Sequence, residues 1–201
     1  MDFIKKRLTD DEEEKMFQSG SKLIMSGRYD DAISLFKELV NYGCEHYTYL
    51  IAMGYEAKEG SNNLKSALNY YQRAARLEGK YNLDVGRILL KIHVDGKDLA
   101  NAIHHFKKAM YKQSEMGAQF GLGLAYLQDS PQKNMELAQK HLKAAFNLGH
   151  LMAKRKFYGL KLKEGYLHLL PSFVRSIYDV SHELSLNPQS PKVLIRLDIN
   201  T

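Results

Sequence analysis

An internal repeat constrains this chain more than any other feature of its sequence. Four segments align on alanines at positions 32, 67, 102 and 138, which are separated by 35, 35 and 36 residues. A large apolar residue stands four positions after each alanine: Phe36, Tyr71, Phe106 and Leu142. Seven positions after each alanine stands a leucine or another alanine: Leu39, Ala74, Ala109 and Ala145. Spacings of four and seven lie on one face of an α-helix, so the chain repeats a helical unit.

A second helix is predicted ahead of each alanine-centred helix, and it carries glycines in its interior. These predicted helices cover residues 16–25, 46–58, 83–93, 117–127 and 151–161. Their glycines are Gly20, Gly54, Gly86, Gly121 and Gly123. Glycine costs a helix interior about 1 kcal/mol relative to alanine, so its presence needs a structural reason. We expect each missing side chain to let two antiparallel helices approach closely.

Residues that favour helix ends recur with the same period. Short polar side chains that can accept a hydrogen bond from the first turn predict N-caps at Asn63, Asp98 and Asn134. Glycines suited to the left-handed position after a helix predict helix ends at Gly43, Gly79 and Gly149.

Two known repeat families share these residues and spacings. The first unit resembles the tetratricopeptide repeat in Gly20, Gly27, Tyr29, Ala32 and Phe36. Later units resemble the Sel-like repeat more closely, in Leu122-Gly123-Leu124-Ala125-Tyr126 and in Ala67, Tyr70-Tyr71 and Ala74-Ala75. The resemblance covers residues 14–164. It departs from the family where the third unit keeps only Ala109 of the paired alanines, and where histidine replaces the first aromatic residue at His105 and His141.

The resemblance implies an all-α fold, a right-handed α-solenoid of about four to five antiparallel helix pairs with a C-terminal capping helix. Residues 1–13 form a charged lead-in to the repeats. Residues 165–186 are predicted to form the capping helix, with an apolar face made by Phe173, Ile177, Val180, Leu184 and Leu186. Residues 187–201 follow as an extended tail, because the stretch from Val193 to Ile199 alternates with a period of two.

Composition places the chain among ordinary globular proteins. Its 201 residues suit one domain or two very small ones, and 29 basic against 23 acidic side chains give a net charge of +6 that names no partner. The single cysteine, Cys44, excludes a disulfide within the chain. No secretory leader follows the basic start, and no apolar run approaches the ~20 residues that span a bilayer. We therefore expect a cytoplasmic protein with no membrane segment.

The sequence predicts no catalytic or metal site. It lacks a phosphate-binding loop and a nucleophile elbow. His104 and His105 are adjacent and point about 100° apart on a helix, while His105 and His141 lie on different helices without a further ligand. Cys44 is expected to be a buried packing thiol rather than a nucleophile. We therefore expect a protein that is not an enzyme and holds no cofactor or metal.

The resemblance implies a concave groove, lined by the first helix of each pair, that holds a segment of another protein. Core packing explains three of the positions that correspond to the groove equally well: Ile51, Phe120 and Leu124. Phe120 also belongs to the set expected to bind a partner. That set is Phe17, Tyr55, Lys58, Arg87, Lys91, Phe120, Lys154, Arg155 and Tyr158. Aromatic residues flanked by lysine and arginine suit an acidic peptide. The predicted function is a non-catalytic protein-binding scaffold or adaptor, one version being a dedicated antagonist or immunity-type partner.

Two alternatives remain open at the sequence level. Basic residues cluster with aromatic ones near the end of the repeats, at Lys154, Arg155, Lys156, Lys161 and Lys163. Such a face suits nucleic acid or another phosphate-rich ligand, although a solvated face is the commoner reading. The apolar tail at 187–201 also leaves open self-association through the groove of a neighbouring copy.

Overall fold

A capping box begins the first helix. Thr9 accepts a hydrogen bond from the backbone N–H of Glu12, and the Glu12 carboxylate accepts one from the backbone N–H of Thr9 at 2.9 Å. Acidic residues fill the first turn, where they favour the positive end of the helix dipole. The helix therefore begins at Asp10, inside the segment predicted as a lead-in.

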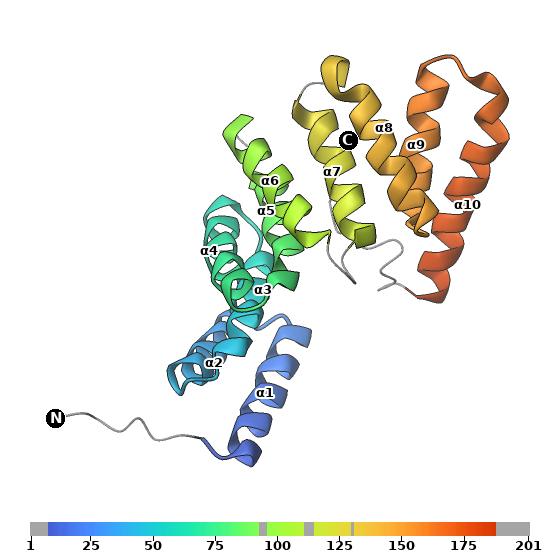
Figure 1. The fold of residues 1–201 in the computed structure, drawn as a ribbon. Helices are drawn as coiled ribbons and strands as arrows, with labels where there is room; N and C mark the ends of the chain where they lie inside the picture. Colours follow the sequence, from blue (N-terminus) through green and yellow to red (C-terminus); the bar gives the residue numbers. More distant parts are fainter. Residues whose placement is uncertain (1–7, 93–95, 111–114, 130, 188–201) are drawn as a thin grey trace. The chain divides into compact units, whose positions relative to one another are not determined.

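The computed structural model describes residues 8–92, 96–110, 115–129 and 131–187 (Figure 1). All regular elements in these ranges are helices, which confirms the all-α prediction for this part of the chain. The chain forms two compact units, Met1–Ile88 and Leu89–Thr201.

The first unit holds four helices and most of a fifth. They are α1 (Asp10–Met25), α2 (Tyr29–Asn41), α3 (Thr48–Ala57), α4 (Ser61–Leu77) and α5 (Asn82–Ile92), which continues into the second unit. Short 3₁₀ turns, η1 (Glu45–Tyr47) and η2 (Gly79–Tyr81), precede α3 and α5. Helices α1 to α4 pack in chain order, each of the first three on the next, around a core that includes Ala32, Ile33, Phe36, Leu39 and Ile51.

The second unit continues with helices that also pack in chain order. They are α6 (Gly96–Ala109), α7 (Glu115–Asp129), α8 (Pro131–Asn147), α9 (Leu151–Lys163) and α10 (Leu170–Leu186), with the 3₁₀ turn η4 (Leu167–Leu169) before the last. Helices α7 to α10 alternate in direction, as Figure 1 shows. Their core includes Phe106, Leu122, Leu142 and Ala153.

The interior glycines mark the closest helix contacts, as the sequence predicts. A Cβ placed on Gly20 of α1 would lie 2.6 Å from the Phe36 ring of α2, and one on Gly123 would lie 2.7 Å from Leu142 of α8. Gly121 faces Phe106 even more closely. Real Cβ atoms do not approach other atoms this closely, so these positions require glycine. The repeated large residues therefore fill the space that the glycines leave.

Several predicted helix ends are wrong. Helix α4 begins at Ser61, and Asn63 lies within it, donating to the Glu59 carbonyl instead of capping. Asp98 and Asn134 likewise lie inside α6 and α8, because these helices begin earlier than the alanine pattern indicates. Gly43 and Gly149 do adopt left-handed φ angles of 102° and 97°, whereas Gly79 belongs to a 3₁₀ turn.

The closing helix buries only part of the predicted apolar face, with Val180 buried and Phe173 half-buried. Helix α10 packs on α9 and buries Ser176 and Val180. Ile177, Leu184 and Leu186 were predicted to share the buried face, yet all three are exposed, Leu186 at 70%. The predicted tail, apart from Asn187, lies outside the described residues.

Candidate functional site

A lysine held over two tyrosines joins three helices of the first unit. Lys37 of α2 donates to the hydroxyl of Tyr55 on α3, with Nζ 2.9 Å from the oxygen. The Lys37 ammonium lies 5.2 Å from the centre of the Tyr55 ring and 5.8 Å from that of Tyr70 on α4. The two rings stack with centres 5.7 Å apart. We name Lys37, Tyr55 and Tyr70 the lysine–tyrosine site.

The lysine–tyrosine site favours a charged ammonium group. The hydrogen bond to Tyr55 raises the pKa of Lys37, and burial opposes this rise only in part. Cation–π attraction adds to the stabilisation of the charge. No carboxylate pairs with Lys37 among the residues that the structure describes. The ammonium group is therefore half-buried and charged, and it is able to form an ion pair with an anion.

Lys58, predicted with Tyr55 as a groove residue, faces the same helix α2. Its Nζ lies 2.5 Å from Oδ1 of Asp30, and its side chain is 28% exposed. The structure thus brings Tyr55 and Lys58 together along α2. The charge of Lys58, however, is already paired with the carboxylate of Asp30.

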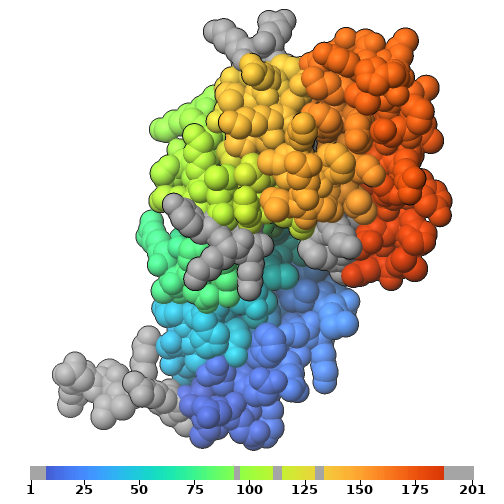
Figure 2. All heavy atoms as spheres, turned by 45° about the vertical axis from the view of Figure 1, so that its right-hand side comes forward, coloured from blue at the N-terminus to red at the C-terminus, as the bar shows by residue number. Residues whose placement is uncertain are grey.

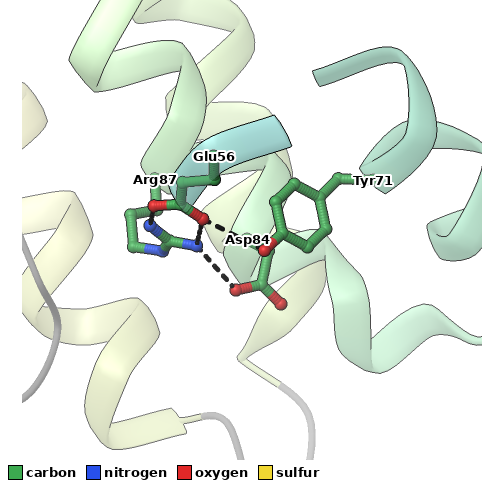
Figure 3. A network of polar contacts seen from close by, with 4 residues as sticks. All are labelled: Glu56, Tyr71, Asp84 and Arg87. Atoms are coloured by element: carbon green, nitrogen blue, oxygen red, sulfur yellow. Dashed lines mark hydrogen bonds and ion pairs between the residues drawn. The ribbon is translucent and has the colours of Figure 1, made fainter. Parts of the chain in front are cut away.

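Arg87 lies in a nearly buried network rather than on an open surface (Figure 3). Its guanidinium binds both carboxylate oxygens of Glu56 on α3 and also pairs with Asp84 at 3.2 Å. The hydroxyl of Tyr71 on α4 donates to Glu56 at 3.0 Å. Burial would lower the pKa of Arg87, but hydrogen bonds and charge from Glu56 raise it above its usual value. Arg87 therefore joins α5 to α3 and α4.

Phe17 packs at the opposite end of the first unit, beside the single cysteine. Its ring stacks on Tyr47 with centres 5.5 Å apart. Next to it, the Cys44 thiol donates to the Glu13 carboxylate at 3.2 Å, and His46 approaches the other oxygen at 3.3 Å. Burial and the bond to Glu13 raise the pKa of Cys44 to about 11. The thiol is therefore protonated near neutral pH, although Cys44 is half-buried rather than buried as predicted.

Phe120 belongs to the core of the second unit. It is 3% exposed and stacks on His150 with ring centres 4.2 Å apart. His150 caps α9 by accepting from the N–H of Ala153, and burial lowers its pKa to about 4. The sequence does not reveal this contact, because it joins residues 30 positions apart in the chain.

The remaining predicted residues lie on α9 and the end of α5. Lys154 pairs with Asp179 of α10 at 2.6 Å and lies 5.7 Å from the ring centre of Phe146. Tyr158 packs against the same ring. Arg155 is exposed and Lys91 is half-buried. The structure therefore brings Lys154 and Tyr158 together around Phe146.

The histidines that replace the family's aromatic residue behave as packing groups. His141 stacks on Tyr126, and its Nδ1 lies 2.7 Å from the amide oxygen of Gln119. His105 contacts its neighbour His104 edge to face. The described residues hold no group of three or more metal-ligating side chains.

Comparison with protein families finds no family model that matches the chain, and no curated protein matches it. The resemblance to the Sel-like and tetratricopeptide repeats therefore stays a prediction. No helix in the described ranges is long and apolar enough to cross a membrane.

Sequence reasoning missed Lys37 and Tyr70, the two residues that complete the site around Tyr55. Both lie on the second helix of a pair, whereas the family pattern assigns binding to the first. Lys37 follows Phe36 directly, and its position one residue beyond the core face was the available signal.

Proposed function

We propose that this protein is a non-catalytic protein–protein interaction scaffold, built as a right-handed α-solenoid of four to five helix pairs and related to the Sel-like and tetratricopeptide repeats. The glycine contacts at Gly20, Gly121 and Gly123 and the packing of helices in chain order support this assignment. Stacks of this kind bind segments of other proteins along their surfaces.

The lysine–tyrosine site carries the proposal. The ammonium group of Lys37 is held in place by Tyr55 on α3 and Tyr70 on α4. The two tyrosine rings add apolar surface next to the positive charge. A carboxylate of a partner would gain a charge-assisted hydrogen bond there, while the rings would pack against the partner chain. We therefore propose an acidic segment of another protein as the ligand.

The other predicted cations take a smaller part in this proposal. Lys58, Arg87 and Lys154 each pair with a carboxylate of the chain itself, so a partner would have to displace an existing ion pair. Arg155 remains exposed. The acidic-partner hypothesis thus depends on Lys37 more than on the cations that the sequence singled out.

The state of Cys44 supports a non-catalytic role. A catalytic thiolate needs a lowered pKa, usually from a neighbouring cation. Cys44 instead donates to the carboxylate of Glu13, which holds its proton in place.

A pull-down from native lysate tests the proposal. The bait is the full chain, compared with Lys37→Glu and with the control Lys65→Glu, which makes the same charge change at an exposed position of α4. The proposal predicts one protein recovered in stoichiometric amount by the wild type and by Lys65→Glu, and lost with Lys37→Glu. Equal recovery by all three baits would refute binding at Lys37.

A nucleic-acid ligand is the second candidate, and one observation favours it. Arg155, Lys156 and Lys163 are all exposed on α9. Desolvation and then the positive charges of Arg155 and Lys163 lower the pKa of Lys156, so the three cations repel one another. A phosphate backbone would relieve this repulsion. Retention on a polyanion column that falls steeply with salt, and that Arg155→Glu abolishes, would favour this candidate over the protein ligand.

A further inference from the structure

Helix α10 leaves a row of large apolar side chains uncovered. The helix packs on α9, beside which it lies in Figure 2 as the red segment next to the orange one, and it buries Ser176 and Val180. Five residues at helical spacing lie on the uncovered side and are between 37% and 66% exposed: Leu170, Val174, Ile177, Tyr178 and Leu184. We name them the open stripe of α10. The small Ser181 continues the row between Ile177 and Leu184.

The open stripe is unusual for the last helix of a helical stack. Terminal units normally present a polar outer face, because nothing follows to cover an apolar one. A contiguous apolar surface in water marks a place where another segment packs.

The chain that follows α10 has the pattern of a segment that would cover the stripe. Residues 188–192 contain Pro188 and Pro191, which favour a change of chain direction. From residue 193 the sequence alternates, so that an extended chain would carry four apolar side chains on one edge: Val193, Ile195, Leu197 and Ile199. The other edge carries Leu194, Arg196 and Asp198.

The dimensions of the two segments agree. From Val193 to Ile199 an extended chain measures about 20 Å at ~3.3 Å per residue. The open stripe from Leu184 to Leu170 measures about 21 Å at ~1.5 Å per residue. Six residues, 187–192, connect the end of α10 to Val193, enough for the chain to turn back. An antiparallel arrangement would therefore set Val193 near Leu184 and Ile199 near Leu170.

We propose that residues 193–199 pack in an extended conformation, antiparallel to α10, over the open stripe of the same chain. This contact would cover the apolar side chains that α10 leaves exposed. It is independent of the lysine–tyrosine site, which belongs to the other unit, so neither proposal rests on the other.

Disulfide trapping in the full chain tests the contact. In a Cys44→Ser background, Ser181→Cys is paired with Ile195→Cys, which faces the stripe in the proposed arrangement. The matched control pairs Ser181→Cys with Arg196→Cys, on the opposite edge of the segment. Under mild oxidation the first pair is expected to form at least about fivefold more intramolecular disulfide, seen as a monomer of altered mobility on a non-reducing gel. Disulfide-linked dimers would instead assign the tail to a second copy, and equal yields in the two pairs would show that the segment does not dock in this way; either result overturns the proposal.

A dye-binding measurement gives an independent readout. Leu197→Asp places a charge on the edge that faces the stripe, whereas Leu194→Asp makes the same change on the other edge. We expect Leu197→Asp to release the segment, raise the fluorescence of a dye that binds apolar surface at least about twofold, and lower the Tm by about 4 °C. Circular dichroism checks that both variants remain helical. Equal dye binding by both variants would contradict the proposal.

Discussion

The carboxylate of Glu56 on α3 holds the guanidinium of Arg87 on α5 through both of its oxygens, although 31 positions separate the two residues. Arg87 is only 11% exposed, so the pair is largely withdrawn from water. Tyr71 and Asp84 complete its surroundings (Figure 3). The pair therefore links the second and third repeat units of the chain.

Removing one member of this pair should destabilise the protein strongly. Arg87→Ala leaves the Glu56 carboxylate without its cation, and we expect the free energy of unfolding to fall by about 3–5 kcal/mol. The exposed pair of Arg73 and Glu45 provides the control, because Arg73→Ala should cost less than about 1 kcal/mol. Urea unfolding of both variants checks the difference, and equal losses would contradict the structural role of Arg87.

Gly20 should not tolerate even a methyl group. The Cβ of alanine would lie 2.6 Å from the ring of Phe36, which is fully buried, so the ring or the helix would have to shift within a packed core. We expect Gly20→Ala to lower the stability by about 1–3 kcal/mol, although alanine is the better helix former. Gly96→Ala in α6 is the matched control, since nothing lies within 4 Å of that position. Unfolding curves should show a loss for the first variant alone.

His150 should make the stability depend on pH. Burial lowers its pKa from 6.5 to about 4 in the folded protein, so the unfolded chain binds a proton at higher pH than the folded one. Stability from this residue is present above pH 6.5 and is lost as the pH falls toward 4. Between pH 7 and 5 the loss should be about 2 kcal/mol.

The variant His150→Asn isolates that effect. Asparagine retains a side chain able to cap α9 but does not titrate. Its unfolding free energy should change less than that of the wild type between pH 7 and 5. The same slope in both proteins would show that other groups cause the pH dependence.

Cys44 should react slowly with alkylating reagents. With a pKa of about 11, far less of the thiol is ionised at pH 8 than for an ordinary cysteine, and alkylation should be about 100-fold slower. Glu13→Gln removes the negative charge next to the sulfur and should accelerate the reaction severalfold. Glu14→Gln, which changes the exposed neighbouring residue, should leave the rate unchanged. Fast alkylation of the wild-type protein would contradict the protonated thiol.

The sequence reveals the helices and their closest contacts because both follow from local spacing. Alanine and an aromatic residue four positions apart identify one face of a helix, and a glycine in the neighbouring helix identifies the place where that aromatic side chain fits. Gly20 with Phe36 and Gly121 with Phe106 show this relationship in the structure. The capping box of Thr9 and Glu12, which was not predicted, explains why α1 begins before the predicted repeat.

The partners of charged side chains could not be predicted in the same way. Arg87 and Lys58 fit the family's groove positions by spacing, but whether such a cation faces solvent depends on a carboxylate from another helix. Lys37 became a candidate only when folding placed Tyr55 and Tyr70 beside it. The exposure of the open stripe of α10 could not be predicted for a similar reason, because periodicity shows that a helix has apolar residues but not which of them a neighbour covers.

The most direct test of the account is the dissociation constant of the captured partner protein for the wild type, Lys37→Glu and Lys65→Glu, measured by calorimetry at physiological salt. If an acidic segment binds the lysine–tyrosine site, Lys37→Glu should weaken binding by at least about tenfold and Lys65→Glu by no more than about twofold. Equal dissociation constants for the two variants would contradict the account and direct attention to the basic residues of α9.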